Sequence, residues 1–124
     1  MTLGDFLAGA AADRGPWNCS TMPADWCLVR GHADFAAAWR DHVDDVHCDA
    51  TVREAGSLLA LWDRGIGDAL PVVGDPQPGD IAVLAAHRIE VGGIFTGDKW
   101  ATRSPRGLLF MRWPATGVRK VWRP

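Results

Sequence analysis

The chain has few of the features that mark membrane, secreted or zinc-binding proteins. Its 124 residues include only three cysteines and no tyrosine. The cysteines are odd in number and show no Cys-x-x-Cys spacing, which disfavours a disulfide framework or a zinc site and suits a reducing compartment. No apolar run is long enough to cross a bilayer. The N-terminal segment is too acidic, and its apolar part too short, for a signal peptide. We therefore expect no membrane association.

The charge balance bears on whether the chain binds nucleic acid. The chain has 13 basic and 15 acidic residues and a net charge of −2. This balance argues against nucleic-acid binding, although the last third of the chain is basic. The composition, 48% hydrophobic and 23% charged, is typical of one folded domain that spans residues 1–124. Seven tryptophans are the main aromatic residues, and tryptophan serves both cores and interfaces.

The pattern of the chain changes near its middle. Residues 1–67 form a helical half, with expected helices at about 2–14, 20–30, 34–42 and 50–64. Residues 72–124 form a strand-rich half, with short β-branched and aromatic segments at 81–86, 88–97, 99–104, 107–113 and 118–123. Helices followed by strands predict an α+β domain, with helices packed on an antiparallel sheet of four to five short strands. We expect residues 81–84 to pair with residues 89–95.

Several motifs carry a resemblance to known families. A cysteine at a helix start, followed by Pro-Gly-Asp-Ile-Ala-Val-Leu and Val-Gly-Gly-Ile-Phe-Thr-Gly, resembles the NlpC-like branch of the papain-like cysteine peptidases. The chain also resembles a family of short uncharacterised proteins from phage tail gene clusters. The segments that carry this second likeness are Asn18-Cys19, Ala24-Asp25-Trp26, His32-Ala33-Asp34-Phe35, Ala38-Trp39-Arg40, Gly79-Asp80-Ile81-Ala82-Val83-Leu84, Gly107-Leu108 and Trp122-Arg123. The resemblance implies a papain-like fold over most of the chain.

Cys19 is the candidate nucleophile, because a helix N-terminus favours a thiolate. A thiol peptidase also needs a base within hydrogen-bond reach. The resemblance places a histidine at the head of the second strand, where this chain has Val91. His87 is the alternative base, but the short hairpin spacing favours an exposed turn histidine.

The segment His42-Val43-Asp44-Asp45-Val46-His47-Cys48 resembles a metal site at first sight. Its ligand types are mixed, and its position is typical of a solvated loop or cap before a helix. Cys27 and Cys48 are interpreted as small hydrophobic residues. We expect neither a metal nor another cofactor.

The C-terminal run interleaves tryptophan with basic residues, the side chains that commonly anchor protein interfaces. Its strand at 107–113 has two apolar faces, and the helices supply only one cover. We therefore expect a contact with another tail protein, or with a second copy of the chain, through Trp113, Trp122, Arg112, Arg119 and Arg123. A chain truncated after Pro114 is expected to stay folded and to lose assembly.

Two hypotheses follow for function. In the first, the chain is a structural or assembly component of a phage or phage-like tail near the distal tip. It is made in the bacterial host cytoplasm and becomes part of the virion. Its fold is then that of a cysteine peptidase that has lost catalysis. In the second, it is an active NlpC-like cysteine hydrolase of cell-wall peptides with Cys19 as nucleophile. An amidase or acyl-transferase of the same fold is a third possibility.

Overall fold

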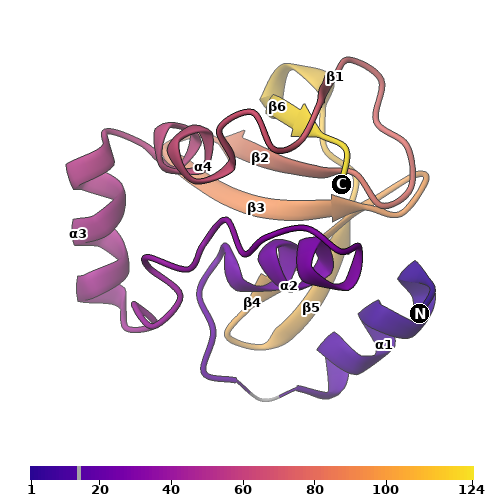
Figure 1. Cartoon of the computed structure of the whole chain (residues 1–124), viewed down its shortest axis with the longest axis horizontal. Coiled ribbons are helices and arrows are strands. Elements are labelled where there is room, and N and C mark those ends of the chain that lie inside the picture. The colour runs from indigo at the N-terminus through magenta and orange to yellow at the C-terminus, as the bar shows by residue number, and fades with distance from the viewer. Residues whose placement is uncertain (14) are drawn as a thin grey trace.

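The computed structural model describes residues 1–13 and 15–124, without the side chains of residues 45–47. Helices come first and strands second (Figure 1). The helices are α1 (Leu3–Ala12), α2 (Thr21–Val29), α3 (Asp45–Ala55) and α4 (Leu58–Ile66). The strands are β1 (Val72–Val73), β2 (Ile81–Ala86), β3 (Ile89–Phe95), β4 (Trp100–Ser104), β5 (Gly107–Met111) and β6 (Val118–Trp122), with a 3₁₀ turn, η1 (Ala115–Gly117), before β6. Among the described residues, no helix is both long and apolar enough to span a membrane.

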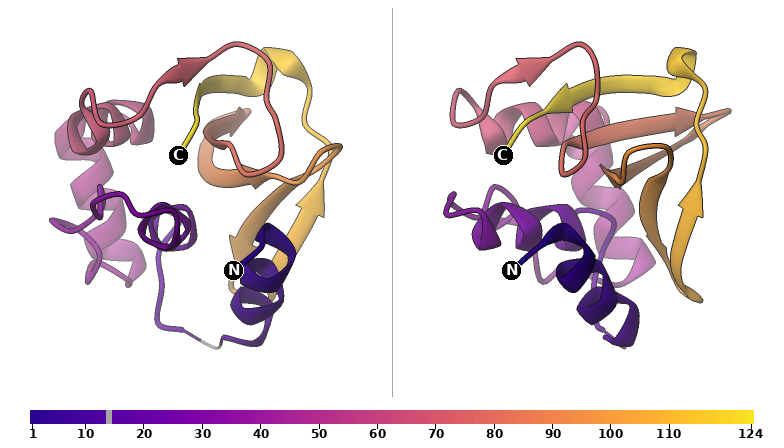
Figure 2. Two further views of the ribbon diagram at one scale, coloured as in Figure 1. Left: turned by 45° about the vertical axis from the view of Figure 1, so that its right-hand side comes forward. Right: turned by 90° about the vertical axis from the view of Figure 1, so that its right-hand side faces the viewer.

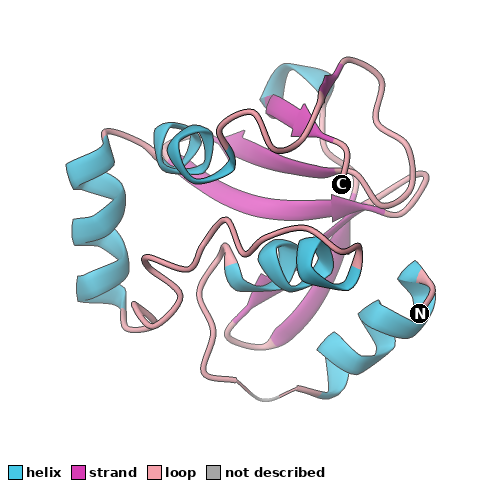
Figure 3. Cartoon of the chain, in the orientation of Figure 1, coloured by secondary structure: helices cyan, strands magenta, loops and turns pink. Residues whose placement is uncertain are grey.

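The strands form one sheet in the order β1-β6-β2-β3-β4-β5, and each neighbouring pair is antiparallel. The predicted α+β class is therefore confirmed (Figure 3). The sheet has six strands rather than four to five, because the two-residue β1 adds to its edge. The expected pairing of β2 with β3 is confirmed, with Ile81 opposite Ile94 and Leu84 opposite Val91.

Two helix predictions were wrong in detail. Residues 35–41 form turns rather than a helix. Their end is held from outside, because the Asn18 amide donates to the carbonyls of Trp39, Arg40 and His42. The helix expected at 50–64 is instead two helices. Gly56, with φ of 105°, separates α3 from α4, and the Ser57 hydroxyl caps α4 by accepting from the Ala60 N–H.

The two faces of the sheet have separate cores. The larger core lies between the helices and the sheet, with Trp62 fully buried at its centre. The Trp62 ring lies 4.8 Å from the Phe35 ring and 5.8 Å from the Trp122 ring. The sheet curves around the helices, with β6 across the top and β4 and β5 down the right of the right-hand view in Figure 2. The smaller core, on the outer face, includes Leu84 and Trp100.

Candidate functional site

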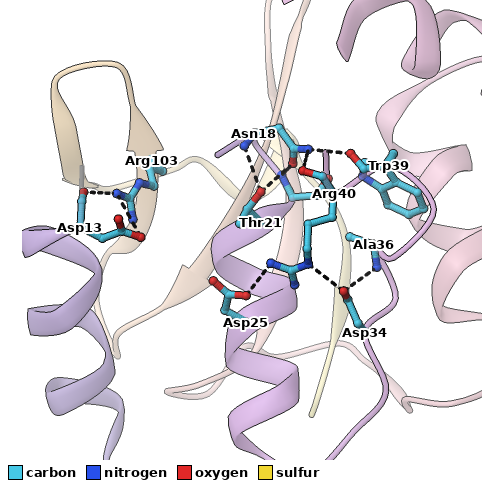
Figure 4. Close-up of polar contacts among 10 residues, drawn as sticks. Asp13, Asn18, Thr21, Asp25, Asp34, Ala36, Trp39, Arg40 and Arg103 are labelled. Atoms are coloured by element: carbon cyan, nitrogen blue, oxygen red, sulfur yellow. Dashed lines mark hydrogen bonds and ion pairs between the residues drawn. The ribbon is translucent and has the colours of Figure 1, made fainter. Parts of the chain in front are cut away.

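Cys19 lies two residues before the first residue of α2 and is thus within one turn of a helix N-terminus, as predicted. The buried Asn18 side chain fixes this segment by accepting from the Ser20 N–H at 2.9 Å and the Thr21 hydroxyl at 3.1 Å. The same side chain donates to the Trp39 carbonyl at 2.9 Å (Figure 4). Asn18 therefore joins the start of α2 to the turn at 35–41 and sets the backbone position of Cys19.

Gly92 lets the Cys19 backbone approach the sheet. A Cβ at position 92 would lie 2.6 Å from the Cys19 carbonyl oxygen and 2.5 Å from the Trp62 ring. The Trp62 indole N–H also donates to the buried Ser20 hydroxyl at 2.9 Å. The Cys19 backbone is therefore held on one side by the Asn18 contacts at the start of α2. On the other side it lies against Gly92 in the middle of β3.

Cys48, on α3, is the side chain that the sequence did not associate with Cys19. The two thiols hydrogen-bond with one another, and this bond together with burial raises the pKa of Cys19 well above its usual value. Both cysteines also line two hollows, of about 380 Å³ and 420 Å³. A raised pKa leaves little thiolate near neutral pH, which is the reverse of an activated nucleophile.

The described side chains bring no imidazole into the hollows beside Cys19. His87 lies in the turn between β2 and β3 with φ of 56°, and it lines neither hollow. Val91, aligned with the expected base position, packs in the smaller core, on the outer face of the sheet. Gly92 and Cys19 lie on the opposite face. His42 forms a 2.7 Å hydrogen bond between its Nδ1 and the Thr51 hydroxyl.

The hollow on the α3 side of Cys19 carries charged groups instead. It is lined by Asp49, Arg53, Arg88 and Glu90. Glu90 accepts hydrogen bonds from the Leu58 N–H at 3.1 Å and the Leu59 N–H at 3.4 Å. Its carboxylate therefore caps the start of α4, where a negative charge is favourable.

The described side chains contain no group of three histidine, cysteine or acidic residues that could hold a metal ion. The segment at 42–48 falls partly outside them, because the side chains of residues 45–47 are not described. Cys27 is fully buried, and burial raises its pKa to about 12. It acts as a small core residue, as expected.

A second candidate site is a hollow of about 660 Å³ on the outer face of the sheet, which we call the outer hollow. Its lining includes Phe95 and Trp113, both half-buried, and the exposed Arg112 and Arg119. The Trp113 indole N–H donates to the Ala85 carbonyl at 3.0 Å, which holds the ring in place. The outer hollow therefore combines fixed aromatic walls with three basic side chains (Arg112, Arg119 and Lys120) and two acidic ones (Asp75 and Asp98).

The outer hollow divides the five residues predicted to bind a partner. Trp113, Arg112 and Arg119 line it. Trp122 does not, because it is 1% exposed in the larger core, where a partner cannot reach it. Arg123 instead binds the buried Asp80, with its Nε 3.0 Å and an Nη 2.9 Å from the carboxylate oxygens.

The proposed truncation after Pro114 is also corrected by the fold. It would remove β6, which lies between β1 and β2 and carries Trp122. The loss would open the larger core. Truncation would therefore unfold the domain rather than separate folding from assembly.

The residues behind the family resemblance are mainly structural. Arg40 donates to Asp34 and to Asp25, each at 2.7 Å, and so ties the turn to α2 (Figure 4). The Trp26 indole N–H donates to the Gly79 carbonyl at 2.8 Å. These contacts join α2 to the turn at 35–41 and to the start of β2.

The fold and the site define a small α+β domain with paired thiols where its helices meet its sheet. The chain belongs to the family described as Domain of unknown function (DUF6950), whose model matches residues 3–124. No curated protein and no solved structure matches the chain.

Proposed function

We propose that this protein is a structural or assembly component of a phage or phage-like tail, near the distal tip. It binds another tail protein through the outer hollow. The observation that carries the proposal is the combination of Trp113, Arg112 and Arg119 around that hollow. Fixed aromatic rings and arginines are the side chains that anchor protein interfaces. The tail assignment itself rests on the resemblance described above.

The charge around the outer hollow favours a particular kind of partner segment. Arg112 is 4.0 Å from Asp98, both largely exposed, so this pair is weak. Arg119 is exposed and makes no side-chain ion pair with the other described residues. A partner segment with an apolar side chain beside a carboxylate complements these groups.

The test is complementation of a phage that lacks the gene for this chain. The double variant Trp113→Ala, Arg119→Glu alters the outer hollow, and Arg64→Glu, at an exposed position on α4, is the control. We expect roughly tenfold less of the double variant in purified tails, with wild-type amounts of the control. Thermal unfolding of both proteins verifies that they are folded. Normal incorporation of a folded double variant would contradict the proposal.

The alternative is a cysteine hydrolase of cell-wall peptides on a papain-like scaffold. The position of Cys19 before α2, beside two hollows, favours it. The raised Cys19 pKa and the absence of an imidazole from the described lining of these hollows disfavour it. We expect no cleavage of a γ-linked cell-wall peptide. Product formed by the wild type and not by Cys19→Ser would establish the hydrolase instead.

A further inference from the structure

Cys19 and Cys48 come together from distant parts of the chain. Cys19 precedes α2 and Cys48 lies on α3, yet the fold brings the two side chains to the same place. Both line the same two hollows, so small molecules can approach the pair from two sides. Both are half-buried thiols, whereas Cys27 is completely buried. The chain thus separates one accessible thiol pair from one enclosed thiol.

We propose that Cys19 and Cys48 form a reversible disulfide that ties α3 to the start of α2. The bond would close the chain between residues 19 and 48 and cross-link two helices that are otherwise separate in sequence. Closing a loop of this size stabilises a fold chiefly by restricting the unfolded chain. The cross-link would also fix one wall of each hollow.

A low-molecular-weight disulfide, such as oxidised glutathione, supplies the oxidising equivalents. One protein thiol loses its proton, and its thiolate attacks a glutathione sulfur, which forms a mixed disulfide and releases one glutathione thiolate. The second protein thiolate then attacks the protein sulfur of the mixed disulfide and releases the second glutathione thiolate. The two protons from Cys19 and Cys48 end on the two glutathione molecules. The protein is oxidised by two electrons, and the glutathione disulfide is reduced by two.

The geometry of the pair predicts how this exchange depends on the fold. Asn18 and Gly92 fix the Cys19 backbone, so one of the two protein sulfurs that join in the second step is held in place before the reaction. Unfolding removes that arrangement and leaves three thiols on a flexible chain. The native fold should therefore favour the Cys19–Cys48 bond over the same bond in the unfolded chain.

The experiment equilibrates the full chain with mixtures of reduced and oxidised glutathione, with and without denaturant. Remaining thiols are trapped with N-ethylmaleimide, and intact mass and peptide mapping identify the products. We expect a single linked species, Cys19 with Cys48, and an equilibrium constant roughly tenfold or more greater in the native chain than in denaturant. Thermal unfolding of the oxidised native chain should occur about 5–10 °C higher than that of the reduced chain.

Three variants complete the test. Cys27→Ala is the control and should form the same link, because Cys27 lies in the core away from the pair's hollows. Cys19→Ser and Cys48→Ser should each abolish it. Native wild-type protein that keeps all its thiols, or that carries glutathione on separate cysteines without the link, would overturn the proposal. An equilibrium constant no greater in the native chain than in denaturant would also overturn it.

Discussion

The two faces of the sheet differ in what covers them. On the inner face, helices and the turn at 35–41 pack with Ile81, Ile94 and Trp122 in the larger core. On the outer face, the described residues that pack with Leu84 and Trp100 come only from strands and loops. The outer face keeps a hollow of about 660 Å³ above this smaller core. The inner face of the sheet therefore serves the stability of the fold, whereas the outer face leaves a surface on which a partner can bind.

The difference separates two kinds of tryptophan. Trp62 is enclosed by aromatic rings and by the Ser20 hydroxyl. Trp113 is half-buried, with its indole N–H satisfied and its ring on the wall of the outer hollow. Residue type alone does not assign either role, since both tryptophans have a hydrogen-bonded N–H. The two roles differ because other side chains cover the Trp62 ring, whereas the Trp113 ring is left on the wall of the outer hollow.

The largest expected effect tests this difference directly. Trp62→Ala should lower the free energy of unfolding by about 3–5 kcal/mol, because it opens a cavity in the larger core. Trp113→Ala should lower it by about 1–2 kcal/mol, through loss of one hydrogen bond and partial burial. Urea denaturation measures both. Equal losses would show that the outer core contributes as much to the fold as the inner one.

The second prediction, with a smaller expected change in the free energy of unfolding, compares a buried carboxylate with an exposed one. The Asp80 side chain is 2% exposed, accepts from Arg123 and also accepts from the Gln77 N–H at 2.8 Å. Asp80→Ala removes these bonds and should lower the free energy of unfolding by about 2–3 kcal/mol. Asp98, with a 67% exposed side chain beside the outer hollow, is the control.

For this comparison, Asp98→Ala should change the free energy of unfolding by less than about 0.5 kcal/mol. Chemical denaturation of the two variants under one set of conditions provides the measurement. If both variants had the same free energy of unfolding as the wild type, the contacts of Asp80 would not be important for the stability of the fold. Asp80 could then be considered for a role other than folding.

Local pattern was sufficient to predict the order of helices and strands, the antiparallel β2–β3 pairing and the position of Cys19 before a helix. It was insufficient for contacts between distant segments. The Asn18 bonds to the carbonyls of the turn at 35–41, and the meeting of Cys19 with Cys48, depend on how separate segments pack. Propensity over a short window contains no information about those partners.

The buried position of Trp122 has a similar explanation. Strict alternation along 118–122 would place Val118 and Trp122 on one face of the sheet. The pairing of β2 with β6 instead shifts between Val83 and Leu84, so that Lys120 opposes Val83 and Val118 opposes Leu84. This irregularity puts Val118 with the outer core and leaves Trp122 in the inner one. Sequence alternation does not reveal a bulge of this kind.

The smallest expected effect concerns the ion pairs that hold the turn at 35–41 against α2. The hydrogen bond from Arg40 lowers the pKa of Asp34 below its usual 3.8. A carboxylate with a lowered pKa in the fold stabilises the fold above the pKa of the unfolded chain, and this contribution is lost as the pH falls through the folded value. It should amount to about 0.5–1 kcal/mol, because solvent partly screens the pair.

Asp34→Asn should therefore reduce the fall in the free energy of unfolding between about pH 4 and the lowered Asp34 pKa, measured by urea denaturation at a series of pH values. The matched background is Arg40→Met, which removes the cation from both carboxylates that it contacts. In that background, Asp34→Asn should have little further effect on the acid slope, because Arg40 is the main cause of the lowered pKa. If Asp34→Asn changed the slope equally in both backgrounds, the acid dependence at this position would arise from a source other than the pairing with Arg40, and the Ala36 N–H that bonds to Asp34 would be the next contact to alter.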